Sequence, residues 1–270
     1  MSLDPYDDED YDDELDAQLE EYDFELELEP EPGYLALTRG ASYSFLISLP
    51  LLAMYEILIS AVNTGNAVGV RVGADVWTKR ILSATGVSTH LTLGTIALAV
   101  GIIIFMRDSR RSIPLHKSYF VGMLVESCFY AVILAYIIYK VVEAIFVPAA
   151  GSPPDAAIAG GAGLATQLAL SLGAGLYEEL FFRLILVTGL YALCRLMLGS
   201  IKAYLIAAVV GALIFSWVHY IGPFGDPFHL ATFTFRFLFG LALNVLFIAR
   251  GFGIAAWTHA IYDIMVVMIQ

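Results

Sequence analysis

The chain has 270 residues, of which 59% are hydrophobic and 15% are charged, and its mean hydropathy is +0.76. This composition excludes an ordinary soluble domain and predicts an integral membrane protein. The net charge of −12 comes from the first 32 residues, which hold 16 of the 26 acidic residues and no lysine or arginine.

The N-terminal segment 1–33 is predicted to be a disordered acidic tail, because it cannot bury enough apolar surface to offset the entropy lost on folding. It is either simply solvated or a docking arm for a basic partner. Residues 34–270 are then expected to form the transmembrane domain.

Apolar stretches near the length of about 20 residues that a bilayer helix requires recur after the tail. They predict an all-α, polytopic bundle of seven or eight transmembrane helices. The expected spans are 41–62, 87–106, 119–147, 163–187, 202–220, 229–249 and 252–269. The stretch 184–198 decides the number, since it either continues a long helix or forms a separate interfacial piece.

Basic residues in the connections gather on one side of this topology, eight against three. The bias predicts a cytoplasmic N-terminus and fits a protein of the plasma (inner) membrane. The expected surroundings are lipid, and no nucleic acid is expected as a partner. Both cysteines, Cys128 and Cys194, lie in apolar runs and are expected to be small core residues.

The stretch AGLYEELFFRLIL places three charges in an apolar run. Each costs on the order of 3 kcal/mol at mid-membrane, so the group should face a protein interior or a wet cavity and marks a functional site. Glu179 and Arg183 are four residues apart in the order that favours an ion pair, whereas Glu178 points about 100° away on an α-helix. An unpaired carboxylate such as Glu178 suits a general base or acid.

Two following helices supply histidines. Glu178 and His219 lie almost equally far from the turn at Gly199, so an antiparallel hairpin would place them at nearly the same depth, and Phe215 shares a helix face with His219. In the last helix, Asp263 is four residues after His259 and can orient its imidazole or a water.

Six further polar residues in the spans are expected to line the cavity or to pair across helices, with snorkelling as the alternative for Lys140 and Arg236. They are Glu56, Glu126, Lys140, Glu143, Arg236 and Asn244. No catalytic role is assigned to any of them.

Three motifs in this order resemble those of the CPBP intramembrane proteases, which include the type II CAAX prenyl endopeptidases and the bacterial Abi membrane proteins. EELFFR is similar to EExxxR, FSWVH to FxxxH and HAIYD to HxxxN/D. The resemblance covers about 160–270, which would be the motif-bearing core.

The resemblance implies peptide-bond hydrolysis within or at the edge of the membrane. By position it implies that Glu178 activates water and that His219 and His259 position it or stabilise the oxyanion. Asp263 stands where many members have Asn, and an ionised carboxylate cannot donate to an oxyanion, so it would orient His259 or stay protonated. Glu179, Arg183 and Phe215 would be supporting residues.

Two chemistries remain open. Glu178, His219 and His259 could form a zinc site with an open water position. The chain lacks HExxH, however, and the family resemblance favours a metal-independent glutamate mechanism without a cofactor.

Three functions are considered. The leading hypothesis is an endopeptidase that acts on a membrane-associated or lipidated protein. The main rival is a non-catalytic membrane scaffold or immunity factor that uses the same helical core. A transporter with a proton-relay glutamate is weaker, because no inverted repeat is evident.

Overall fold

In the computed structural model, every regular element of the described residues is a helix, so the predicted all-α class is confirmed for that part of the chain. The described residues are 33–64, 69–84, 100–104, 106–108, 113–150, 163–222 and 225–269. The predicted acidic tail lies outside them except for Gly33. Leu37–Gln270 forms one compact unit.

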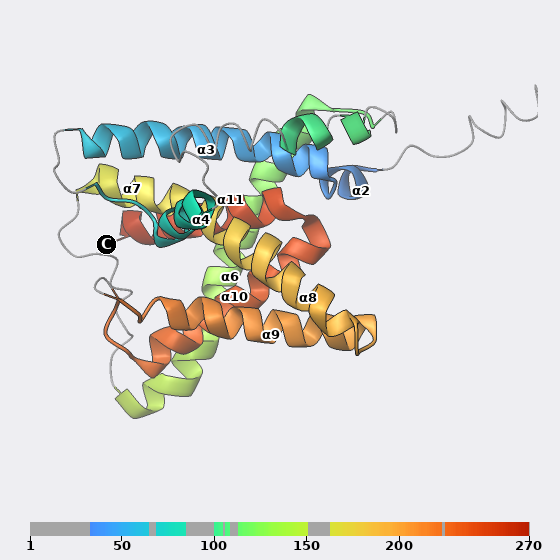
Figure 1. Ribbon diagram of the computed structural model, residues 1–270. Helices are drawn as coiled ribbons and strands as arrows, with labels where there is room; N and C mark the ends of the chain where they lie inside the picture. Colours follow the sequence, from blue (N-terminus) through green and yellow to red (C-terminus); the bar gives the residue numbers. More distant parts are fainter. Residues whose placement is uncertain are drawn as a thin grey trace, which may run out of the picture. The chain divides into compact units, whose positions relative to one another are not determined.

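Figure 1 labels the helices except η1, which lies between α7 and α8, and the chain follows them in numerical order. They are α2 (Tyr34–Thr38), α3 (Ala41–Asn63), α4 (Gly73–Ala84), α6 (Lys117–Ala150), α7 (Leu164–Gly173), η1 (Ala174–Val187), α8 (Thr188–Arg195), α9 (Ser200–Val218), α10 (Leu230–Arg250) and α11 (Phe252–Ile269).

Within the described residues, five helices are long and apolar enough to cross a membrane, which indicates a multi-pass integral membrane protein. They cover Ala41–Asn63, Lys117–Phe146, Ser200–Val218, Leu230–Arg250 and Phe252–Ile269. This count covers the described residues only and does not show the predicted seven or eight spans. The expected span 87–106 lies mostly outside the described residues, and 163–187 is helical but is not one of the five.

The expected span 163–187 falls in a helical run that is divided among α7, η1 and α8. It continues without a break from Leu164 to Arg195, so the ambiguous stretch 184–198 begins as the continuation of one long helical run. The run changes helix type at Ala174 and again at Thr188, and it carries the three charges of the motif. A turn then leads to Gly199, the N-cap of α9, and α8 and η1 both contact α9 as the predicted hairpin requires.

Helix α11 is the centre of the compact unit, where it contacts α3, α6, α7, η1 and α10 (Figure 1). Small buried residues, among them Gly253, Ala256 and Ala260, let the neighbouring helices approach closely. Trp257 fixes the α3 contact, since its indole nitrogen donates to the carbonyl of Ile47 at 2.7 Å. The last helix is thereby held in place for the side chains it carries.

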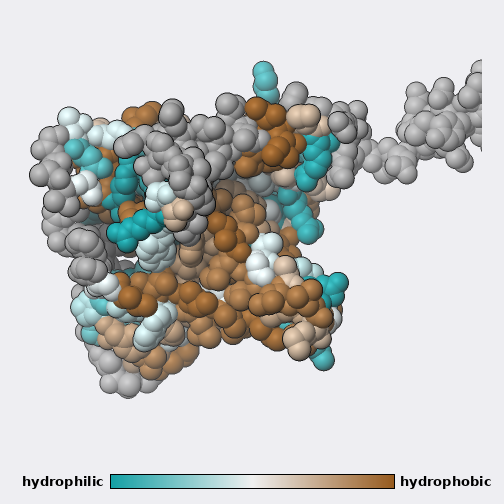
Figure 2. Space-filling view, in the orientation of Figure 1, coloured by the Kyte–Doolittle hydropathy of each residue, from teal (hydrophilic) through white to brown (hydrophobic). Residues whose placement is uncertain are grey.

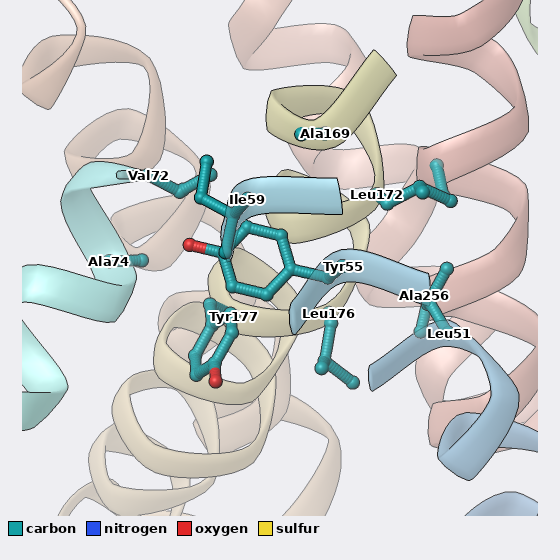
Figure 3. Packing of buried hydrophobic residues seen from close by; sticks show 11 residues of the cluster. Leu51, Tyr55, Ile59, Val72, Ala74, Ala169, Leu172, Leu176, Tyr177 and Ala256 are labelled. Carbon is teal, nitrogen blue, oxygen red and sulfur yellow. The ribbon is translucent and has the colours of Figure 1, made fainter. Parts of the chain in front are cut away.

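Aromatic side chains join α3 to the motif helix. The rings of Tyr55 and Tyr177 meet edge to face, with centroids 5.2 Å apart (Figure 3). Leu51 and Ile59 of α3 and Leu176 of η1 belong to the same buried cluster (Figure 3). This packing fixes η1 on the side that faces α3.

Apolar side chains also cover the exterior. Figure 2 shows them gathered over α9, where Ile201 and Leu205 are exposed. In a membrane protein such side chains face lipid, which replaces water as the solvent of the surface. Cys128 belongs to this exterior, because it is exposed, so the expectation that it is a core residue is wrong.

An ion pair fastens α10 to α6. Arg250 lies at the end of α10, and its Nε and Nη2 atoms donate to the two carboxylate oxygens of Glu126 at 2.5 and 2.8 Å. Its Nη2 atom also donates to Thr38 at 2.8 Å. Glu126 is thus one of the span residues that pair across helices, as predicted.

Arg250→Ala is expected to lower the free energy of unfolding by about 3–5 kcal/mol, because it leaves the Glu126 carboxylate without its ion-pair partner in a largely buried position. Thermal unfolding in detergent measures this loss. Arg195→Ala is the matched control, since Arg195 is exposed at the end of α8. Equal melting temperatures for both variants would contradict a structural role for the pair.

Candidate functional site

The motif helix η1 is a 14-residue π-helix, in which backbone hydrogen bonds join residues five apart. The spacing of its charged residues had been interpreted on an α-helix. Each turn of a π-helix contains more residues than a turn of an α-helix. Glu179 and Arg183, four residues apart, are still separated by almost one full turn, so their side chains can meet. π-helical turns are rare and occur frequently at functional sites.

The ion pair predicted from spacing is present, and it is buried. Arg183 Nη1 lies 2.9 Å from Glu179 Oε1, and the two side chains are 1% and 0% exposed. Arg183 Nη2 also reaches the carbonyl of Gly240 on α10 at 3.5 Å. The pair therefore ties η1 to α10 from inside the bundle.

Glu179 has a second partner, which sequence reasoning missed. Its Oε1 atom accepts from Nδ1 of His259 at 2.7 Å, so one carboxylate oxygen serves both the guanidinium and the imidazole. The distance from His259 Nε2 to Asp263 Oδ2 is longer, 3.6 Å. The residue that orients His259 is thus Glu179 rather than Asp263. Because 80 positions separate Glu179 from His259, no helical spacing could have indicated the contact.

Glu178 lies where two imidazoles converge. Its Oε2 atom is 3.9 Å from Nε2 of His219 and 4.0 Å from Nε2 of His259. Glu178 comes from η1, His219 caps the C-terminus of α9 and His259 comes from α11. The structure therefore brings together these three residues, which the sequence analysis placed on separate helices.

The hydrogen bonds of the two histidines fix which ring nitrogen faces Glu178. His219 Nδ1 donates to the carbonyl of Phe215 at 2.7 Å, because a carbonyl oxygen can only accept. His259 Nδ1 likewise donates to the carboxylate of Glu179. Nε2 of each ring therefore faces the carboxylate of Glu178, as an acceptor when the ring is neutral and as a donor when it is protonated. A water molecule, with two protons to donate, is the ligand that such a group of acceptors suits.

Phe215 packs among the charged and ring groups of the site. The guanidinium carbon of Arg183 lies 4.5 Å from the centre of the phenyl ring, a cation–π distance. The same ring is edge to face with His219 at 5.0 Å and with His259 at 6.0 Å between centroids. Phe215 therefore packs against the guanidinium and both imidazoles, which limits how the two imidazole rings can tilt.

The residues do not fit the zinc alternative. In the part of the chain that the structure describes, no group of three or more His, Cys, Asp or Glu side chains has an arrangement that could hold a metal ion. The separations of 3.9 and 4.0 Å between Glu178 and the histidines are those of groups that a water can bridge. We therefore derive no step through a metal.

A second polar cluster holds η1 from the side of α3 and α4. Tyr177, the neighbour of Glu178 in the chain, donates to Glu56 at 3.2 Å. Arg71 lies 3.7 Å from Glu56 and pairs with the fully buried Asp75 at 2.9 Å. Tyr55 also donates to Asp75, at 2.8 Å. The backbone that carries Glu178 is thus anchored on both sides.

The remaining polar span residues also find partners. Asn244 donates to the carbonyl of Ala208 at 2.8 Å and so pairs α10 with α9. Lys140 and Glu143 pair with each other on α6, at 2.6 Å. The Lys140–Glu143 pair lies within one helix and joins no two helices, and none of these residues contacts Glu178 in the described contacts.

One comparison with known proteins gives a match. Residues 160–265 match the family model described as type II CAAX prenyl endopeptidase Rce1-like. The matched region contains η1, α9 and α11 as far as residue 265, and these segments carry Glu178, Glu179, Arg183, Phe215, His219, His259 and Asp263. No curated protein and no solved structure matches the chain.

Proposed function

From the premise that residues 160–265 form a type II CAAX prenyl endopeptidase Rce1-like domain, we propose that this protein is an intramembrane endopeptidase. Its substrate would be a membrane-associated or lipidated protein. The observation that carries the proposal is the approach of two imidazole Nε2 atoms to a single oxygen of Glu178, at 3.9 and 4.0 Å.

Glu178 is the general base in this proposal. A water molecule held by Glu178 and His219 gives a proton to the carboxylate, and its oxygen attacks the carbonyl carbon of the scissile peptide bond. The tetrahedral intermediate then collapses, the C–N bond breaks, and the proton held by Glu178 passes to the leaving amine. Atoms and protons balance without a further reactant.

The two histidines have different tasks. His219, whose Nδ1 is fixed by a backbone carbonyl, uses Nε2 to accept from the attacking water. His259 is held by Glu179, so in its protonated form it can donate from Nε2 to the oxyanion. Asp263 lies 3.6 Å from the same Nε2 atom and would assist that protonated form. The carboxylate of Glu179 thus positions a residue that contacts the reacting atoms.

Glu178→Gln is expected to abolish processing, because an amide cannot accept the proton of the attacking water. General-base catalysis contributes about 10²- to 10⁴-fold to a rate. The measurement is quantitative proteomics of membranes that contain the variant at the wild-type level, where an unprocessed precursor should accumulate. Glu143→Gln, the same change at the Lys140 pair on α6, is the control and should leave processing unchanged.

Complete processing by Glu178→Gln would contradict the endopeptidase proposal and favour a scaffold that only binds its partner. A strong chelator added to the wild-type reaction tests the zinc alternative separately. Undiminished cleavage is expected from the glutamate mechanism, whereas loss of cleavage that added zinc restores would refute it.

A further inference from the structure

Arg236 on α10 is a cation that the proposed mechanism does not use. Its Nη2 atom donates to Asp226 at 2.5 Å, and its guanidinium lies 5.1 Å from the ring centre of Tyr220. Asp226 and Tyr220 belong to the segment that follows His219, and the backbone N–H of Asp226 donates to the carbonyl of His219 at 2.9 Å. Arg236 is therefore held against the part of the chain next to the site.

The guanidinium of Arg236 keeps one donor group without a partner. Within the described residues, its Nη1 atom is buried and makes no hydrogen bond. A buried donor that stays unsatisfied costs about 1–3 kcal/mol, more when it is charged. The side chain as a whole is 23% exposed, but Nη1 itself is buried, so a ligand that binds Nη1 requires neighbouring side chains to shift.

Two residues of α10 that follow Arg236 contact the site residues. Phe239 is three residues further along, and the centroid of its ring lies 5.4 Å from the centroid of the His259 ring. Gly240, four residues further along, accepts from Arg183. One turn of α-helix rises about 5.4 Å, so Arg236 lies about one turn away from the level of the catalytic groups.

The other guanidinium of the site cannot reach a substrate. Arg183 is 1% exposed, paired with Glu179 and covered by Phe215. The groups near the scissile bond, Glu178 and Asp263, are carboxyl groups that would repel an anionic ligand. Arg236 is thus the guanidinium among the described site residues that can offer an N–H to an anion on the substrate.

We propose that Arg236 is a specificity-determining residue that binds a carboxylate of the substrate, through Nη1, about one helical turn from the scissile bond. This inference rests on the proposed endopeptidase function. The carboxylate is either the C-terminus of the substrate or an Asp or Glu side chain close to the cleaved bond. Both offer the planar acceptor that a guanidinium recognises.

The test uses the full-length protein in liposomes and a pool of synthetic N-acylated hexapeptides. Each peptide is made as the C-terminal acid and as the amide, and with Glu or Gln at matched internal positions. Mass spectrometry identifies the peptides whose cleavage requires Glu178, and kcat and KM are measured for the best matched set. Wild type should prefer one carboxylate over its neutral counterpart by about 10- to 100-fold, mainly through KM.

Arg236→Gln should remove this preference by raising KM for the anionic peptide to that of the neutral one, while kcat stays within about twofold. Arg236→Lys should keep part of the preference, because it retains the charge without the planar fork. Arg195→Gln, at the exposed end of α8, should leave the preference intact. Arg236→Gln could fail to fold because Asp226 loses its partner. In that case the double variant Arg236→Gln with Asp226→Asn, which removes both charges, is measured in place of the single variant.

The outcomes separate the two proposals. Glu178-dependent cleavage without preference for a carboxylate overturns the role of Arg236 and leaves the endopeptidase function standing. A fall in kcat at unchanged KM in Arg236→Gln overturns it as well, because the residue would then act on the transition state. Absence of any Glu178-dependent cleavage overturns the endopeptidase function together with this inference.

Discussion

Glu179→Gln is expected to lower both the amount of folded protein and the activity. The side chain is fully buried, and its Oε1 atom contacts both Arg183 and His259, at 2.9 and 2.7 Å. Loss of the carboxylate leaves a guanidinium buried without its counter-ion, which costs about 3–5 kcal/mol. Glutamine also holds His259 less well, because its neutral amide can present either a donor or an acceptor to Nδ1.

A double variant separates these two effects. Glu179→Gln combined with Arg183→Met removes both members of the buried pair, and such replacements are often neutral in stability. The folded fraction and the melting temperature should recover, while kcat stays lower by about 10²-fold or more, since the carboxylate that holds His259 is still missing.

The measurements are thermal unfolding in detergent and cleavage of the peptide that wild type cuts best. Glu143→Gln serves again as the control for an acid-to-amide change on an unrelated helix. Recovery of both stability and kcat in the double variant would show that Glu179 only supports the fold. The assigned role of orienting His259 would then be wrong.

Gly175→Ala is expected to disrupt the site through packing alone. A Cβ atom at this position would lie 2.5 Å from the Cβ of Ala260, 2.6 Å from the carbonyl oxygen of Ala256 and 2.7 Å from the amide nitrogen of Ala260. Two of these obstacles are backbone atoms, so η1 and α11 would have to move apart. These two helices carry Glu178 and His259.

Overpacking of this kind costs about 1–3 kcal/mol or more, and a displacement of about 1 Å between reacting groups can lower a rate by about 10²-fold. The melting temperature and kcat should therefore both fall. Gly189→Ala is the matched control on the same helical run, since a Cβ there meets nothing within 4 Å. That change should be neutral or stabilising by up to about 1 kcal/mol. Equal behaviour of the two variants would contradict close η1–α11 packing.

The all-helical class could be predicted from the sequence because apolar stretches near spanning length leave few alternatives in lipid. The number of spans stays a prediction. Hydropathy does not resolve that the run Leu164–Arg195 changes helix type and carries a buried ion pair. Orientation and compartment remain predictions.

Part of the candidate site could be predicted because it depends on spacing within one helix or across one helical hairpin. The spacing of Glu179 and Arg183 indicates an ion pair on any helix whose turns bring them together. The near-equal distances of Glu178 and His219 from Gly199 indicate a shared depth once the hairpin forms. The catalytic roles of Glu178, His219, His259 and Asp263 remain proposals.

The rest depends on contacts between helices distant in sequence. The sequence by itself determined an apolar, helical membrane protein with a charged motif and two histidines that could meet it. Only the tertiary structure decided that His259 is oriented by Glu179 rather than Asp263 and that Arg236 pairs with Asp226 beside the site. The physical reason is that helical periodicity relates residues within one turn or two, whereas these partners meet only after α9, α10 and α11 pack against η1.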